Sequence, residues 1–173
     1  MPIDRTWWNN LVDDPGSGTV GTVWNKATIA GLLDAIDGLF VGPFNFTTAL
    51  IASGGGSGTY SSSVILYQKT GQVVTIAGRV TLTSKGSLAG SLSLTLPYVG
   101  NTYHYQQGVL VVPYFSGVTI PIAQLSGYIN QNANFVTLTY VPGGGSTAAT
   151  GALDASQITG ALDLMFSATY LTN

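Results

Sequence analysis

The sequence predicts a mainly β protein: an antiparallel β-sandwich of jelly-roll type with a short N-terminal helix. Polar and apolar residues alternate along most segments after residue 43, as they do in strands that bury one face. These segments follow one another at regular spacing, with Gly- and Pro-rich turns between them, which is typical of sandwiches and barrels. Helical spacing occurs in one stretch only, before residue 41. We therefore expect a docking segment with a helix at residues 1–42 and a β-sandwich domain at residues 43–173.

The N-terminal segment contains two adjacent tryptophans, Trp7 and Trp8, and a third, Trp24, precedes the expected helix. None of them belongs to a periodic element with a core of its own. They either fold back onto the β domain or insert into a partner, because buried Trp is a favoured interface residue. We take all three as candidates for docking to a larger assembly.

One amphipathic helix is expected after Trp24. Apolar residues recur there at helical spacing: Ile29, Leu32, Leu33, Ile36 and Phe40. Gly38 is a suitable stop. A helix of roughly sixteen residues is marginal by itself in water, so it must pack on its own β domain or against copies of itself. Leu32, Leu33 and Ile36 are therefore candidates for a seam between subunits.

Residues 67–97 are expected to form the central hairpin of the β domain. The predicted inward-facing residues are Val74, Ile76, Val80, Leu82, Leu92, Leu94 and Leu96. Turn-forming residues occupy positions 84–87, between the two strands. Further along, residues 109–115 are apolar on both faces, as expected of a strand that is covered on both sides or lies at a subunit contact. Residues 164–171 form the closing strand.

Charged residues make up only 7% of the chain, and no carboxylate lies between Gly38 and Leu153. That interval holds the single histidine, His104. A glycosidase needs two carboxylates beside the scissile bond, and a metal site needs clustered ligands; the β domain has neither pattern. A Ser-His-Asp site would require His104 to meet Asp154 or Asp163, which the spacing does not support. We therefore expect no enzyme activity, no metal and no cofactor.

The same composition argues against two classes of partner. The five Lys and Arg residues are scattered along the chain, whereas binding to nucleic acid phosphates needs clustered basic residues. The longest apolar run, residues 109–115, is too short to span a bilayer, and no signal peptide is evident at the start. Low charge also reduces the solubility of a free monomer, which favours residence in an assembly.

Particular motifs add a family resemblance to this pattern. Residues 67–97 have the sequence YQKTGQVVTIAGRVTLTSKGSLAGSLSLTLP, and the chain ends with LDASQI followed by LMFSATY. These motifs resemble a β-sandwich module found at the tips of bacteriophage tail fibres and in related receptor-binding virion proteins, over residues 44–173. The preceding motifs, GTVWNK and LLDAID, resemble the short helical stem of such proteins, where three chains associate.

The resemblance implies a homotrimer on the phage particle surface, attached to other virion proteins by the N-terminal tryptophans. The leading hypothesis for its role is attachment to a host-surface carbohydrate through the exposed β tip. Candidate sugar contacts are Tyr98, Tyr103, His104 and Tyr105, although tyrosines in this loop would equally suit a subunit seam. The alternative is a capsid or tail decoration protein that stabilises the particle without binding a receptor. A short chain with its own Met1 favours decoration, and the aromatic loop favours attachment.

Overall fold

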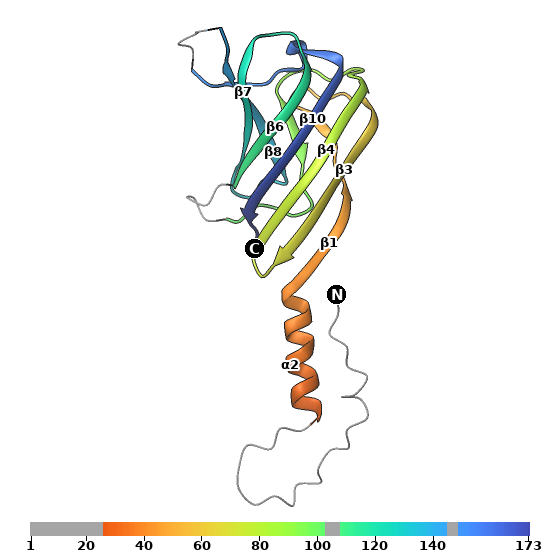
Figure 1. Cartoon of the computed structure of the whole chain (residues 1–173), viewed down its shortest axis with the longest axis vertical. Coiled ribbons are helices and arrows are strands. Elements are labelled where there is room, and N and C mark those ends of the chain that lie inside the picture. The colour runs from red at the N-terminus through yellow and green to blue at the C-terminus, as the bar shows by residue number, and fades with distance from the viewer. Residues whose placement is uncertain (1–25, 103–107, 145–148) are drawn as a thin grey trace, which may run out of the picture. The chain divides into compact units, whose positions relative to one another are not determined.

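The computed structural model describes residues 26–102, 108–144 and 149–173 (Figure 1). The elements in these ranges are α2 (Lys26–Leu39), β1 (Phe40–Thr47), β2 (Leu50–Ala52), β3 (Thr59–Thr70), β4 (Val73–Ser84), β5 (Leu92–Thr95), β6 (Gly108–Val118), β7 (Ile122–Ile129), β8 (Phe135–Pro142), β9 (Gly151–Ala152), a 3-10 turn η1 (Ala155–Gln157) and β10 (Ile158–Leu171). The predicted helix is confirmed, and it ends at Leu39, one residue beyond Gly38. The chain divides into two compact units, Met1–Val41 and Gly42–Asn173.

The strands form one sheet in the order β1-β3-β4-β10-β6-β7-β8-β5-β2, with β9 paired to β8. The sheet curls strongly, so that residues between β1 and β2 bridge its two ends. The Thr48 amide donates to the Ser63 carbonyl in β3 at 3.0 Å, and the Thr48 hydroxyl donates to the Thr95 carbonyl in β5 at 2.8 Å. The mainly antiparallel β class is confirmed, but the strands form a single curled sheet, like a half-barrel, and not two clearly separate layers.

The core fills the inside of this curl. All seven residues predicted to face inward on residues 67–97 are buried, because alternation along a strand is a local property that survives any change in pairing. Gly78 interrupts this inward row on β4 and is paired with Ile65 on β3 and with Phe166 on β10. A Cβ at Gly78 would lie 2.7 Å from the Val64 carbonyl oxygen. The close approach of β3 therefore requires glycine at this position.

The expected hairpin of β4 with β5 is wrong. β4 pairs with β3 and β10, whereas β5 pairs with β2 and β8. The ladder between β4 and β10 joins Val73–Thr81 to Asp163–Leu171, but β5 has only four residues to offer. The longer partner forms more backbone hydrogen bonds and buries more apolar area, and it therefore replaces the neighbour that is closer in sequence.

A bulge between β6 and β10 determines which way the apolar residues of β6 point. Val111 pairs with Ser167 and Tyr114 with Met165, so β6 has one more residue than β10 between these two pairs. Pro113 lies in this interval, where its lack of an N–H is tolerated. Leu110 and Val112 face the core, whereas Val109, Val111 and Tyr114 are exposed. The run that is apolar on both faces thus has one face in the core and the other uncovered within this chain.

Candidate functional surface

The outward sides of β3, β4, β10 and β6 form an apolar surface that we call the outer apolar face, defined by Val64, Leu66, Ala77, Val111 and Met165. Strand register places Leu66 beside Ala77, Ala77 beside Ser167, and Ser167 beside Val111. The exposed fractions of Val64, Leu66, Val111 and Met165 are 46%, 54%, 56% and 45%. Exposed apolar side chains that adjoin one another across several strands are typical of interaction surfaces.

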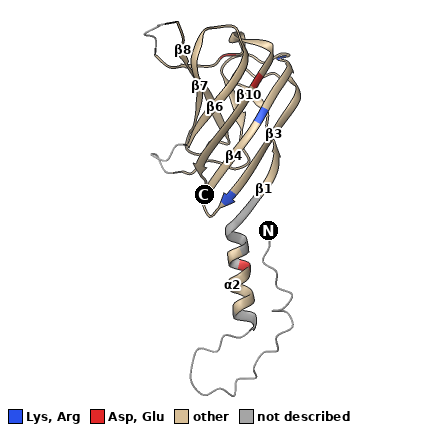
Figure 2. Cartoon of the chain, in the orientation of Figure 1, with Lys and Arg blue, Asp and Glu red and all other residues tan. Residues whose placement is uncertain are grey.

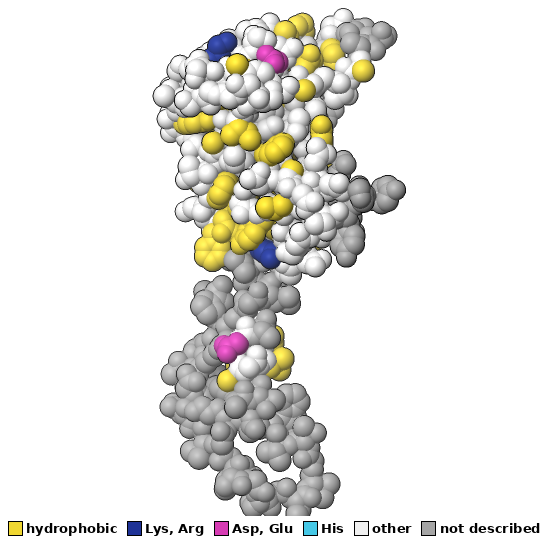
Figure 3. Space-filling model, turned by 180° about the vertical axis from the view of Figure 1, so that it is seen from behind, with side chains coloured by type: hydrophobic (Ala, Val, Ile, Leu, Met, Phe, Trp, Pro, Cys, Tyr) yellow, Lys and Arg dark blue, Asp and Glu magenta, His cyan; other side chains and the backbone are white. Residues whose placement is uncertain are grey.

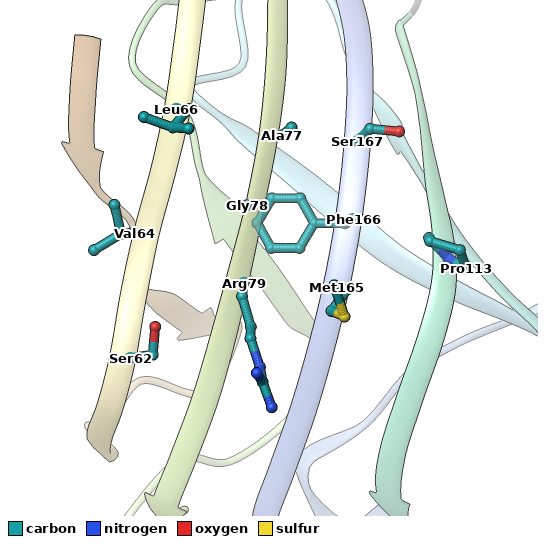
Figure 4. A pocket seen from close by; sticks show the side chains of 10 residues that line it. All are labelled: Ser62, Val64, Leu66, Ala77, Gly78, Arg79, Pro113, Met165, Phe166 and Ser167. Atoms are coloured by element: carbon teal, nitrogen blue, oxygen red, sulfur yellow. The ribbon is translucent and has the colours of Figure 1, made fainter.

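A shallow trough of about 470 Å³ runs over this face. Figure 4 shows Val64 and Leu66 along β3 on one side of the trough, Pro113 on β6 on the other, and Arg79 at one end. A second depression of about 230 Å³, over β4, β10 and β6, adjoins the first at Ser167. The floor of the trough is low because Ala77 and Ser167 are small and lie between Leu66 on β3 and Pro113 on β6.

A bonded ion pair lies at one end of the outer apolar face. Arg79 donates from Nε to Asp163 Oδ1 at 2.9 Å and from Nη2 to Oδ2 at 2.6 Å, and the Thr81 hydroxyl donates to Oδ1 at 2.8 Å. The hydrogen bonds from Arg79 hold the pKa of Asp163 below its usual value; burial opposes this shift and the bond from Thr81 adds to it. Each charge neutralises the other, so this end of the face presents no net charge.

The other carboxylate considered at the sequence level, Asp154, has a structural role in a turn. It accepts hydrogen bonds from the amide and the hydroxyl of Ser156 at 2.8 and 2.7 Å, and its own amide donates to Gln157 Oε1 at 2.9 Å. This reciprocal arrangement is a capping box at the start of η1. The bonds from Ser156 lower the pKa of Asp154. The carboxylates of Asp154 and Asp163 are therefore each engaged with neighbouring donors.

Tyr98, a predicted sugar contact, belongs to an aromatic cluster. Its ring meets the Tyr67 ring edge-on with centroids 5.6 Å apart, and the Lys69 ammonium lies 5.2 Å from the ring centre. The Tyr98 amide donates to Tyr170 Oη at 3.3 Å, and Tyr170 Oη donates to the Tyr98 carbonyl at 3.2 Å. Burial raises the pKa of Tyr170, which keeps this phenol protonated. Tyr98 thus has packing partners, while Tyr103, His104 and Tyr105 lie outside the described residues.

The other residues predicted for binding lie in the N-terminal unit. Trp7, Trp8 and Trp24 are outside the described residues. Leu32 and Ile36, one helical turn apart on α2, are both exposed, and Leu33 is half-buried. Two exposed apolar residues at this spacing lie on the same side of a helix, so α2 carries an apolar strip formed by Leu32 and Ile36.

Charged side chains are sparse on the β domain. Figure 2 marks only a few along the strands, and the surface in Figure 3 is mainly polar and uncharged with separate apolar patches. Among the described residues no group of three or more His, Cys, Asp or Glu side chains could hold a metal ion. Within the same ranges, no helix combines the length and the apolar character needed to cross a membrane.

The sequence reasoning singled out residues 109–115 but missed Val64, Leu66 and Met165. The same signal was present at those positions. Val64, Ile65 and Leu66 are consecutive apolar residues in a strand, as are Leu164, Met165 and Phe166. A strand with one solvated face alternates apolar and polar residues, and both of these triplets break the alternation, as residues 109–115 do.

No protein-family model matches this sequence, and no curated protein is significantly similar to it. Among solved structures, the fold is similar to that of the Dettilon tailspike protein (gp208), with a TM-score of 0.62 and 19% sequence identity. The match covers 75% of this chain and 23% of the tailspike chain. The resemblance to phage tail proteins indicated by the sequence motifs is therefore confirmed at the level of the fold.

Proposed function

We propose that this chain is a component of a phage tail that presents its β domain for attachment to the host surface. The observation that carries the proposal is the fold, because three quarters of the chain superimposes on part of a protein described as a tailspike. The motifs in residues 67–97 and at the chain end favour the same assignment independently of that comparison. Since a fold alone does not define a function, the surface of the chain must supply the rest of the argument.

Two separate surfaces support a homotrimer. The outer apolar face has four large side chains that are each about half exposed, and its only charges within the described residues, Arg79 and Asp163, neutralise each other. The apolar strip on α2 adds Leu32 and Ile36. Copies of the same chain would cover both surfaces without leaving a buried charge unpaired. The choice of three copies comes from the stem motifs that precede the β domain.

The proposal also assigns the contacts of the chain with the virion and with the host. Trp7, Trp8 and Trp24 would anchor the chain to other virion proteins, and a host-surface carbohydrate would be recognised by the β domain. Tyr103, His104 and Tyr105 follow Tyr98 in the sequence, and the ring of Tyr98 packs in the aromatic cluster. The chain would act by binding and not by cleavage, consistent with the engaged state of Asp154 and Asp163.

Immunogold labelling of particles with an antibody against the β domain, combined with adsorption assays, tests the role. Label at the tail, together with loss of adsorption when the protein is removed, is the expected result. Label over the head, with normal adsorption and particles that break more readily on heating, would contradict attachment and establish the decoration alternative. Changing Tyr103 and Tyr105 to Ala tests their role in attachment: adsorption should fall while thermal stability stays the same.

A further inference from the structure

A pocket of about 310 Å³ opens on the outward side of β2, β5 and β8. Strand register places Ile51 beside Ser93, and Ser93 beside Thr137, in one row across the three strands. Phe135 lies two residues from Thr137 on β8, and so on the same face at one end of the pocket. Ser53 and Ser91 lie at the other end. The volume is at the lower end of the roughly 300–1,000 Å³ typical of small-molecule sites.

The pocket forms because its central residue is small. Ser93 lies between Ile51 and Thr137, which project farther from the sheet, so its position becomes the floor. Although it points away from the core residues Leu92 and Leu94, Ser93 is only 9% exposed. Its hydroxyl has no hydrogen-bond partner among the described residues. A nearly buried hydroxyl without a partner is uncommon in proteins, and here it faces a space that a ligand can fill.

Two hydrogen bonds between Ser53 and Ser91 hold the rim of the pocket. The Ser53 amide donates to the Ser91 carbonyl at 3.0 Å, and the Ser91 amide donates to Ser53 Oγ at 3.0 Å. Gly90 has a φ of +86° and leaves no space for a side chain beside Ser53. Ser91 also pairs with Asp154, the residue that caps η1. These constraints keep the pocket open without a ligand, which favours binding because little has to be ordered.

The lining combines two kinds of surface. Ile51, Ala52 and Phe135 are apolar, whereas the hydroxyls of Ser91, Ser93 and Thr137 have no hydrogen-bond partner among the described residues. No lining residue is charged. An anion would find no counter-charge here, and a hydrocarbon would leave the Ser93 hydroxyl buried without a partner. A matching ligand therefore has C–H faces, several hydroxyls and no charge.

We propose that this pocket, centred on Ser93, binds one neutral pyranose sugar unit. The ring's C–H face packs on Phe135 and Ile51, and its hydroxyls exchange hydrogen bonds with Ser93, Thr137 and Ser91. The source of the sugar, a host-surface glycan, rests on the proposed attachment role, but the site itself does not. Sugar binding by the purified chain and location on the virion are measured separately, so that either proposal can fail without the other.

The proposal is tested by NMR titration of the isotope-labelled full chain. The sugars added are methyl glucoside, methyl galactoside, methyl mannoside and N-acetylglucosamine, and the backbone amide chemical shifts report binding. We expect at least one sugar to saturate with a millimolar dissociation constant and to move the amides of Ser53, Ser91, Ser93 and Thr137. Glucuronic acid, the charged counterpart of glucose, should not saturate. Absence of saturable shifts with every neutral sugar, or shifts confined to other residues, would overturn the proposal.

Two variants test the proposed hydrogen bonds between the pocket and the sugar. Ser93→Ala and Thr137→Val each remove one hydroxyl and keep the size of the side chain nearly constant, so each should weaken binding by about 2- to 10-fold. Ser167→Ala removes a similar hydroxyl from the trough on the outer apolar face, and sugar affinity should not change. Equal affinities for wild type and both pocket variants would refute the assignment. Loss of affinity in Ser167→Ala alone would place the sugar in the trough instead.

Discussion

Replacing Leu66 and Val111 together by Thr should weaken self-association while leaving the fold intact. Both side chains point outward from β3 and β6 and are 54% and 56% exposed. Complete burial of such a side chain contributes about 1.5–3 kcal/mol relative to full exposure. Roughly half of each remains to be covered by a partner, so each contributes about 0.8–1.5 kcal/mol at the contact.

The double variant should therefore lose about 1.5–3 kcal/mol per subunit contact, equivalent to roughly 10- to 150-fold in the dissociation constant. Thr is β-branched and suits a strand, and Val111→Thr conserves shape, so the thermal midpoint of the isolated subunit should change little. Sedimentation equilibrium over a wide concentration range measures the oligomeric state. Val141→Thr, at an exposed position on β8, is the matched control. A monomeric wild type, or a double variant that associates as well as wild type, would refute the reasoning.

Three further predictions concern the β domain itself. Asp163→Asn should make the free energy of unfolding depend less on pH in acid. Arg79 lowers the pKa of Asp163, so the ion pair stabilises the fold above about pH 4, and this stabilisation disappears as the pH falls through the lowered pKa. Urea midpoints that depend on pH as in wild type would contradict this. Gly78→Val should destabilise the domain by about 1–3 kcal/mol, because the new Cβ would meet the Val64 carbonyl oxygen of β3. Ala77→Val, at the adjacent outward-facing position, should leave the stability unchanged, and calorimetry distinguishes the two variants. Tyr170→Phe should lower the free energy of unfolding by about 1–3 kcal/mol, because it leaves the Tyr98 amide and carbonyl without their partner; unchanged urea unfolding would show that water replaces the phenol.

Most individual strands were predictable because alternation depends only on neighbouring residues. Val74, Ile76, Val80 and Leu82 face the core as expected. For residues 109–115, which are apolar on both faces, the sequence did not indicate which residues face inward. The helix was also predictable from the spacing of its apolar residues. These features arise from backbone geometry within one element, which the order of residues in that element specifies.

The pairing of the strands was not predictable in the same way. Turn residues after β4 favoured a hairpin with β5, yet β10 takes the place beside β4 although Asp163 and Thr81 are far apart in sequence. Pairing is decided by the total ladder length and the apolar area that each arrangement buries, and local turn preferences contribute less. The single curled sheet, in place of two layers, is a consequence of that choice.

The candidate binding surfaces follow the same division. The sequence by itself determined that Ser93 faces away from the core, since it alternates with Leu92 and Leu94, and that Val111 belongs to a run that is apolar on both faces. Only the tertiary structure decided that Ile51 and Thr137 flank Ser93 and turn it into the floor of a pocket. It likewise decided that Leu66 on β3 and Pro113 on β6 line one trough. Residues from distant strands become neighbours only through the register of the sheet, and register is specified jointly by all the strands that share the core.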